Sequence, residues 1–306
     1  MAKIYGWAYM GGKVVPMAEA NVSVASSAVL YGLSVYTVFP IVMTDEGLAA
    51  FRLKDHWKRL TNSAKIIGID TFRESWTEER FVEAAKEVIA ANGLTEDAFA
   101  RVTIHVTELV PGTRSRGLKT DLSIFVYEAA CILPKDGARV KTSVWRRIPD
   151  FAIPSRAKVN GAYVNSVLAR QDAIDSGYDD SVFLDTFGHV CELSAANIFL
   201  ARDGILYTPN RASDILEGIS RKTLFAIARD AGLDVREHSI DFTELYVADE
   251  IFACGTSAFL TPILEVDKRP VNGGMIGPLT QKLQQKYLDV LHGKVPEYRD
   301  FLTPLS

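Results

Sequence analysis

The chain has 306 residues, of which 48% are hydrophobic and 24% charged, and its net charge is −4. This composition is typical of a well-packed globular protein, and the length favours two domains over one. The acidic balance offers no basic face for nucleic acid. No uncharged apolar run approaches the roughly 18 residues of a membrane helix, and the amino terminus lacks a signal-peptide core. Three cysteines without C-x-x-C spacing indicate neither a disulfide framework nor a metal site, so we expect a cytoplasmic protein.

Hydrophobic spacing predicts both strands and helices in the first part of the chain. Leu53, Trp57 and Leu60 recur at helical spacing, which predicts a helix with one buried face. Gly11 and Gly12 separate two strand-like runs, as in a hairpin turn. The expected elements are, in order, a hairpin over 3–17, a strand over 35–43, helices over 53–69 and 77–94, and strands over 98–109 and 121–133.

A break in the pattern at 133–139, Leu-Pro-Lys-Asp-Gly-Ala-Arg, predicts a linker. We therefore expect a smaller N-terminal domain over 1–132 and a larger, cofactor-binding C-terminal domain over 140–306. Strands and helices mix in both parts, which indicates the α/β or α+β class. The expected elements of the second part are a strand over 139–148, a helix over 160–175, a hairpin-rich sheet over 180–209, a helix over 218–233, a strand over 250–255 and a helix over 277–293. The helix over 160–175 has a predicted buried stripe of Val164, Val167, Leu168, Gln171 and Ile174.

Lys158 lies among small and apolar residues, including Ala157, Val159, Gly161 and Ala162. A lysine is usually a solvated surface residue, and that interpretation stays open for this side chain by itself. Apolar neighbours disfavour the charged ammonium, however, and a partly neutral amine can form an imine with a carbonyl group. The pattern therefore makes Lys158 a candidate nucleophile.

Two glycine-containing turns are candidates for anion binding. Residues 217–220, Glu-Gly-Ile-Ser, precede a predicted helix, so the amides of Ile219 and Ser220 are expected at its amino end beside the Ser220 hydroxyl. The same segment also fits an ordinary serine N-cap. Residues 254–259, Cys-Gly-Thr-Ser-Ala-Phe, form a similar turn after a predicted buried strand, and they include Thr256 and Ser257.

Two charged side chains are expected to point inward. Glu192 lies in an apolar run, and a buried carboxylate is costly unless it meets a cation or a donor, so we predict a partner for it. That partner is either an ordinary salt bridge or a protonated ring nitrogen. Arg59 lies close to the apolar stripe of the helix over 53–69, whereas most other charged residues of 52–59 are expected to be solvated.

These features together match the requirements of pyridoxal 5'-phosphate (PLP): an imine-forming lysine, a carboxylate for the ring nitrogen, a tyrosine for the ring oxygen and a phosphate-binding turn. The chain resembles the class IV PLP-dependent aminotransferases, which include branched-chain aminotransferases, D-amino-acid aminotransferases, (R)-selective amine transaminases and aminodeoxychorismate lyase. The resemblance covers nearly the whole chain. Its most specific parts are the run from AKVNGAYVNS to SAANIF at 157–199, EGISRKT at 217–223 and CGTSAFLTPI at 254–263.

The resemblance implies a role for each matching residue. Lys158 matches the lysine that bonds to the cofactor and shuttles the proton of the reaction. Tyr163 matches the tyrosine that contacts the phenolic oxygen, and Glu192 matches the carboxylate that keeps the pyridine nitrogen protonated. The implied phosphate contacts are Arg59, the amides of Ile219 and Ser220, and Thr256. Ser220 stands where the family usually has threonine and keeps the hydroxyl, and Asn197 is given only a supporting role beside Glu192.

The resemblance also implies an architecture and a mechanism. The expected fold is that of the two-domain, D-amino-acid aminotransferase-like PLP enzymes of fold type IV. The expected chemistry is ping-pong transamination through Schiff bases, in which amino donors and 2-oxo acids react in turn. The family further implies a homodimer or a larger homo-oligomer, in which Tyr31 reaches the active site of the neighbouring subunit.

The run at 31–40, YGLSVYTVFP, departs from the YGxxVFEGIR typical of branched-chain enzymes. Val38 replaces a glycine, which adds bulk at the implied pocket wall. Arg101 matches an arginine of the branched-chain enzymes, but Phe99 replaces their tyrosine and lacks its hydroxyl. The implied substrate pocket consists of Tyr31, Tyr36, Val38, Phe99, Arg101, Thr256 and Ser257.

The pocket leaves several activities open. The run over 36–39 is closer to (R)-selective amine transaminases, whereas the Lys158 segment and the carboxyl-terminal half are of branched-chain type. We therefore expect an enzyme that moves an amino group between branched-chain or other hydrophobic L-amino acids and 2-oxo acids such as 2-oxoglutarate. The alternatives are (R)-amine transamination, alone or as a second activity, then D-amino-acid transamination or the lyase reaction. A non-catalytic small-molecule binder would not need the lysine and phosphate-binding residues that are present.

Overall fold

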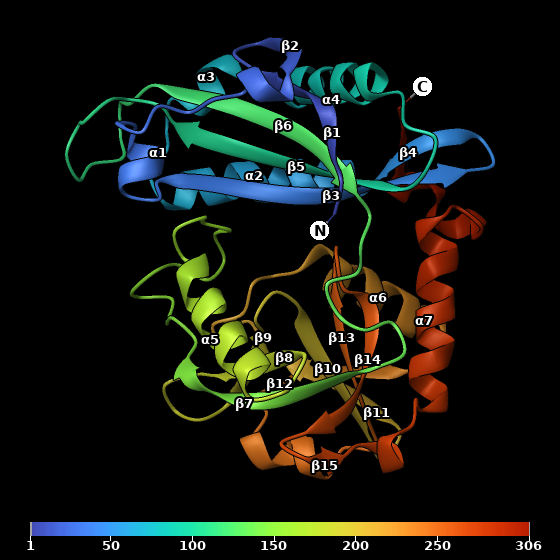
Figure 1. Ribbon diagram of the computed structural model, residues 1–306. Helices are drawn as coiled ribbons and strands as arrows, with labels where there is room; N and C mark the ends of the chain where they lie inside the picture. The colour runs from blue at the N-terminus through green and yellow to red at the C-terminus, as the bar shows by residue number, and fades with distance from the viewer. Residues whose placement is uncertain (1, 306) are drawn as a thin grey trace. The chain divides into compact units, whose positions relative to one another are not determined.

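The computed structural model describes residues 2–305, which form two compact units, each built from separate stretches of the chain (Figure 1). Unit 1 comprises residues 2–130, 157–162 and 290–305, and unit 2 comprises residues 131–156 and 163–289. Each unit has its own β-sheet, which confirms the predicted mixed α/β class. The predicted domains over 1–132 and 140–306 are continuous stretches, whereas the units place 157–162 and 290–305 with the first part of the chain. The domain boundaries stay a prediction.

Unit 1 contains an antiparallel sheet in the order β16-β4-β3-β5-β6-β1-β2. Its strands are β1 (Ile4–Met10), β2 (Lys13–Pro16), β3 (Ser34–Thr44), β4 (Gly47–Phe51), β5 (Ala98–Val106), β6 (Thr120–Glu128) and β16 (Leu302–Pro304). Gly11 and Gly12 join β1 to β2 with φ angles of 63° and 81°, which glycine adopts without strain. The predicted hairpin is therefore confirmed.

The core of unit 1 lies between one face of this sheet and the helices that pack on it. The helices are α1 (Ser27–Leu30), α2 (Leu53–Ile66), α3 (Phe72–Ser75) and α4 (Glu78–Asn92), with short 3-10 turns η1 (Met17–Glu19) and η4 (Pro296–Phe301). The predicted α2 stripe is buried and packs with Val35 and Phe39 of β3. Trp57 of α2 stacks on Phe81 of α4 with ring centroids 5.0 Å apart. Because side chains alternate along a strand, Tyr36 and Val38 project from the opposite face of the sheet.

Unit 2 contains a mixed sheet in the order β12-β11-β10-β13-β14-β7-β8-β9, with β15 paired to β14. Its strands are β7 (Ala138–Arg146), β8 (Asp180–Leu184), β9 (Val190–Leu193), β10 (Asn197–Arg202), β11 (Ile205–Pro209), β12 (Asp234–His238), β13 (Glu250–Gly255), β14 (Phe259–Val266) and β15 (Arg269–Pro270). The parallel pairs are β7 with β8, β7 with β14, and β11 with β12. The helices are α5 (Tyr163–Asp175), α6 (Ile219–Asp230) and α7 (Pro278–Leu291), with 3-10 turns η2 (Phe242–Tyr246) and η3 (Asn272–Gly274). Within residues 2–305, the helices all lack the length and hydropathy that crossing a membrane requires.

The prediction for α5 was wrong in two respects. The helix begins at Tyr163 and not at residue 160, because the preceding residues form a bridge to β3 instead. Its buried residues are small, namely Ser166, Ala169 and Ala173, and they let the helix approach β7 and β8 closely. The stripe predicted to be buried is exposed throughout: Val164, Val167, Leu168, Gln171 and Ile174.

Candidate active site

The segment that carries Lys158 is attached to β3 of unit 1. The Tyr36 amide donates to the Lys158 carbonyl and the Asn160 amide to the Ser34 carbonyl, each at 3.0 Å. The Lys158 amide in turn donates to Ser63 Oγ of α2 at 3.0 Å. The half-buried Lys158 side chain places Nζ 4.9 Å from the centre of the Tyr36 ring. Two elements of unit 1 therefore fix the backbone on both sides of the candidate lysine.

A pair of glycines permits this attachment. A Cβ on Gly32 would lie 2.8 Å from the Gly161 Cα, a separation that real Cβ atoms do not show. Gly32 also has a φ of 63°, which other residues adopt with strain. The YG pair at 31–32 and the NG pair at 160–161 are therefore packed backbone to backbone.

Arg59 projects from α2 into a small polar network on the helix-covered face of β3. Its Nη2 donates to Thr37 Oγ1 at 3.0 Å, and the same hydroxyl lies 2.7 Å from His56 Nδ1. Burial lowers the pKa of His56 well below its ordinary 6.5, and the positive charges of Arg59, Arg52 and Lys158 lower it further. His56 is therefore neutral near pH 7, and Arg59 is supported by uncharged groups at this point.

The predicted inward orientation of Arg59 is therefore found, but the expectation for its neighbours was partly wrong. His56 and Arg52 are also buried, with 1% and 5% of their surface exposed. Arg52 forms an ion pair with Asp55 at 2.6 Å and lies 4.2 Å from the centre of the Phe301 ring. A charged residue one turn from an apolar stripe can be buried when a carboxylate and an aromatic ring are both within reach.

Four of the predicted substrate residues share the other face of the unit 1 sheet. Val38 pairs with Arg101 across β3 and β5, and Phe99 lies two residues away on the same strand. Arg101 Nη2 donates to Asn160 Oδ1 at 2.8 Å, and its guanidinium carbon lies 3.7 Å from the centre of the Tyr36 ring. The cation is thus held in one place beside apolar side chains. Tyr31 lies elsewhere, at the carboxyl end of α1, and is 47% exposed.

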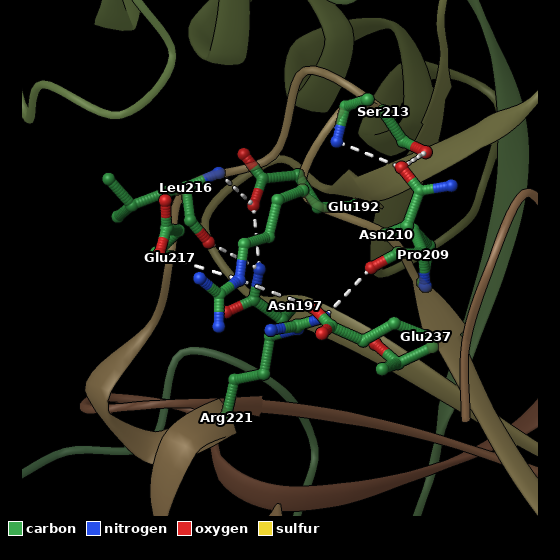
Figure 2. Close-up of polar contacts among 12 residues, drawn as sticks. Glu192, Asn197, Pro209, Asn210, Ser213, Leu216, Glu217, Arg221 and Glu237 are labelled. Atoms are coloured by element: carbon green, nitrogen blue, oxygen red, sulfur yellow. Dashed lines mark hydrogen bonds and ion pairs between the residues drawn. The ribbon is translucent and has the colours of Figure 1, made fainter. Parts of the chain in front are cut away.

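In unit 2, Glu192 of β9 has the partners that its burial requires, as predicted (Figure 2). Its Oε1 lies 2.9 Å from Arg147 Nη2. Its Oε2 accepts from Asn197 Nδ2 at 2.9 Å and from the Leu216 amide at 3.2 Å. Three donors, one of them cationic, therefore stabilise the charged form of the carboxylate.

The amino end of α6 has the features of an anion site that were predicted. Gly218 is the N-cap and supplies no side-chain cap, and the first helical hydrogen bond runs from the Lys222 amide to the Gly218 carbonyl. The amides of residues 219–221 therefore point out of the helix end. The Ser220 side chain is buried, and its Oγ accepts from the Tyr287 hydroxyl at 3.0 Å.

The three remaining predicted residues also lie in unit 2, two of them in a turn and the third at the start of a helix. Thr256 and Ser257 lie in the turn that joins β13 to β14, which is closed by the pairing of Gly255 with Phe259. The Ser257 carbonyl accepts from the Ile132 amide at 2.9 Å, which anchors the turn. Tyr163 is the first residue of α5 and is half-buried.

Sequence reasoning missed the supporting residues of both groups. Arg147, Tyr287 and His56 contact Glu192, Ser220 and Thr37, from which they are separated by 19 to 67 residues along the chain. The one hint in the sequence is Thr37, which stands in YGLSVYTVFP where the YGxxVFEGIR of branched-chain enzymes has glutamate.

Comparisons with known proteins identify the family of the chain. The family model for Amino-transferase class IV matches residues 34–266. A probable branched-chain-amino-acid aminotransferase from Aquifex aeolicus is 35% identical over 303 residues, which cover 98% of this chain and 96% of that relative. The branched-chain-amino-acid aminotransferase of Escherichia coli K12 is 33% identical over 294 residues, 94% of each chain.

Solved structures show the same fold. The branched-chain aminotransferase from Thermoproteus uzoniensis, crystallised with norvaline, has a TM-score of 0.94 and 37% identity, and the match covers 99% of this chain and 100% of that one. The branched-chain amino acid aminotransferase from Thermobaculum terrenum in its PLP-form has a TM-score of 0.92 and 31% identity, with 99% of both chains covered. The chain belongs to the class IV aminotransferase family. The predicted family, fold and aminotransferase class are confirmed, and the (R)-amine feature stays a prediction.

Proposed function

We propose that this protein is a PLP-dependent aminotransferase that moves amino groups between branched-chain or other hydrophobic L-amino acids and 2-oxo acids such as 2-oxoglutarate. The observation that carries the proposal is the match to branched-chain aminotransferases over at least 94% of the chain, together with every side chain that PLP chemistry needs. One solved relative carries pyridoxamine 5'-phosphate and another is described in its PLP-form.

The donor set fits PLP. A pyridine nitrogen needs a carboxylate, and Glu192 is a buried carboxylate whose charged form is stabilised by its donors. A phosphate dianion needs helix amides, hydroxyls and a guanidinium, which α6, Ser220, Thr256 and Arg59 offer. When bound, PLP supplies an aldehyde that condenses with amines and a protonated ring that withdraws electrons from the reacting carbon.

In unit 1, Lys158 would hold the cofactor through its Nζ, and the same atom would carry the proton of the reaction. Hydrogen bonds to β3 and α2 hold its backbone, so that the amine moves about a fixed Cα. Arg59 binds the phosphate, and Thr37 holds its Nη2 without neutralising its charge. Unit 1 therefore carries Lys158 and the phosphate-binding guanidinium of Arg59 in this proposal.

In unit 2, Glu192 would accept a hydrogen bond from the protonated ring nitrogen, and Arg147, 2.9 Å from Glu192 Oε1, stabilises the charge of this carboxylate. Tyr163 contacts the ring oxygen. The remaining phosphate contacts are the amides of Ile219 and Ser220, the Ser220 hydroxyl and Thr256. Each of these residues acts by binding and orienting the cofactor.

For the substrate, we propose contacts by two chemically different sets of residues. Val38 and Phe99 are buried apolar residues on the same face of the unit 1 sheet, and we assign the hydrophobic side chain of the substrate to them. Arg101 is a fixed cation on that face, suited to a carboxylate. Additional contacts are proposed for Tyr31, Tyr36, Thr256 and Ser257.

We also infer that the enzyme is at least a homodimer and works in the cytoplasm. The exposed apolar stripe of α5, which includes Val164 and Val167, supports an interface with a second copy, since such stripes are usually covered. The exposed position of Tyr31 is consistent with a contact in the neighbouring subunit. The three cysteines are unpaired, which suits a reducing compartment.

The spectrum of the purified protein tests the proposal. Added PLP should produce a yellow absorbance band, and Lys158→Ala should change that band, whereas the control Lys54→Ala at an exposed lysine should not. The proposal is wrong if the parent protein gives no band with PLP, or if the band of Lys158→Ala is identical to that of the parent.

Half-reactions with single amino donors then rank the substrates. L-leucine and L-glutamate should each bleach the band. Bleaching by (R)-1-phenylethylamine alone would make the protein an (R)-amine transaminase, and bleaching by D-alanine alone would make it a D-amino-acid enzyme. Release of pyruvate from aminodeoxychorismate would identify the lyase.

A further inference from the structure

One amide in unit 2 joins Glu192 to the amino end of α6 (Figure 2). Asn197 is the first residue of β10 and is 6% exposed. Its Nδ2 donates to Glu192 Oε2 and to the Leu216 carbonyl, each at 2.9 Å. The Leu216 amide closes the triangle by donating to the same Glu192 oxygen at 3.2 Å. Both protons of the Asn197 amide group are therefore committed.

The other end of the same amide lies against Gly218, the N-cap of α6. A Cβ on Gly218 would lie 2.0 Å from Asn197 Oδ1 and 3.3 Å from its Cγ. The φ of Gly218 is −67°, which any residue adopts, so that glycine is required here for space and not for conformation. The Asn197 side chain is thus packed directly on the residue whose carbonyl accepts the first hydrogen bond of α6.

Glu192 and the amino end of α6 each have a side-chain partner that does not contact the other. Arg147 binds Glu192 from one side, and Tyr287 binds Ser220. Among these side chains Asn197 is different because it contacts both parts, and the Leu216 amide adds one backbone hydrogen bond between them. A displacement of Glu192 relative to Leu216 or Gly218 must break one of its hydrogen bonds or close its contact with Gly218.

We propose that Asn197 is a positioning residue that couples the binding of the cofactor ring to the binding of its phosphate. The inference rests on the proposed function, in which Glu192 binds the ring nitrogen and α6 with Ser220 binds the phosphate. PLP carries these two groups at a fixed separation. By tying the ring partner to the phosphate partner, Asn197 sets the matching separation in the protein, so that filling one place orders the other.

A simpler role for Asn197 would be to satisfy the buried Leu216 carbonyl and to stabilise the fold. The two roles differ in a measurable way. A stabilising residue changes the free energy of unfolding, but it leaves the affinities for ring and phosphate independent of each other. A coupling residue makes each affinity depend on the other ligand.

The test uses the full chain freed of cofactor, with two fragments as probes. Pyridoxine carries the ring and the phenol but no aldehyde and no phosphate, and inorganic phosphate represents the other group. Calorimetric titration gives the Kd of pyridoxine without phosphate and at saturating phosphate, and the ratio is the coupling factor. We expect a factor of roughly 5 to 150 in the parent, the usual range for coupled sites.

In Asn197→Ser the coupling factor should fall at least about threefold below that of the parent, because only the Leu216 amide still joins Glu192 to this segment, while phosphate by itself binds within about threefold of the parent. Asn210→Ser is the matched control: the Asn210 side chain caps a nearby turn, accepting from the Ala212 amide at 2.8 Å and from the Ser213 hydroxyl at 3.3 Å, so its coupling factor should be unchanged. Gly218→Ala disturbs the contact with Asn197 by steric clash and should also lower the factor. Adding Asn197→Ser to Gly218→Ala should cause little further loss.

Thermal unfolding shows whether each variant folds. If Asn197→Ser does not fold, the coupling factor of Gly218→Ala tests the inference in its place. A parent coupling factor of one, or a factor that persists in Asn197→Ser or in Gly218→Ala, would overturn the inference. Failure of the parent to bind PLP would overturn the proposed function instead. The two failures are therefore distinguishable.

Discussion

The hydroxyl of Thr37 is the point at which the structure makes the sharpest prediction about Arg59. It lies on the helix-covered face of β3, 3.0 Å from Arg59 Nη2 and 2.7 Å from His56 Nδ1, and Thr37 has no exposed surface. Thr37→Val keeps the β-branched shape and replaces the hydroxyl group by a methyl group. His56 Nδ1 then loses a hydrogen bond in a place that water does not reach, and Arg59 loses one of its supports.

The expected cost follows from the burial of His56. A buried polar atom left without its partner costs about 1–3 kcal/mol, and the added methyl group of valine returns about 0.8 kcal/mol. We therefore expect the free energy of unfolding to fall by about 0.2–2 kcal/mol. Loss of about 1 kcal/mol in the positioning of Arg59 corresponds to roughly fivefold weaker PLP binding.

Urea denaturation of the full chain measures the first effect, and titration of the cofactor-free protein with PLP measures the second. Thr37→Ser is the matched control, because it loses the methyl group but keeps the hydroxyl. Its PLP affinity should stay within about twofold of the parent, since both hydrogen bonds are kept. The reasoning is refuted if Thr37→Val binds PLP as tightly as the parent, or if Thr37→Ser is weakened just as much.

Further predictions concern Ser220, acid stability and assembly. Tyr287→Phe removes the donor 3.0 Å from Ser220 Oγ, and should lower the free energy of unfolding by about 1 kcal/mol. In a double-mutant cycle with Ser220→Ala the two effects should not add, and additive effects would contradict the contact. Burial keeps the pKa of His56 well below 6.5 and lowers that of His105 to about 4, with Arg101 contributing to the latter shift. The unfolded chain therefore takes up these protons at higher pH than the folded one, so that stability is fully present above about pH 6.5 and falls as the pH is lowered toward 4. His105 accounts for at most about 3 kcal/mol of that loss, and His105→Gln should flatten the decline measured by urea denaturation at successive pH values; an unchanged slope would argue against it. On α5, Val164 and Val167 are 64% and 63% exposed, and the double substitution Val164→Glu with Val167→Glu should shift sedimentation toward the monomer without loss of helical signal. A parent that already sediments as a monomer would exclude the proposed dimer.

Periodicity and the cost of burying charge made several features predictable from the sequence. The α2 stripe with Leu53, Trp57 and Leu60 recurs at the helical period, and such a stripe needs only one apolar surface to pack on. The Gly11-Gly12 turn was readable because positive φ angles select glycine. A partner for Glu192 was predictable as a requirement, since an isolated buried carboxylate is too costly. The identity of that partner was not.

The tertiary structure decided the features that depend on residues far apart in the chain. Arg147 and Glu192 meet because β7, β8 and β9 pair side by side, and no local pattern specifies that pairing. The apolar spacing on α5 predicts an apolar helix face, but it does not predict what packs against that face. In the structure, the small residues on the other side of α5 face the sheet. The sequence by itself therefore determined the family and most of the elements, because these depend on residue type and local spacing, and it supplied the set of side chains that we propose to be reactive. Only the tertiary structure decided that Lys158 is attached to β3, and that Asn197 joins Glu192 to α6, because those contacts depend on how distant segments pack.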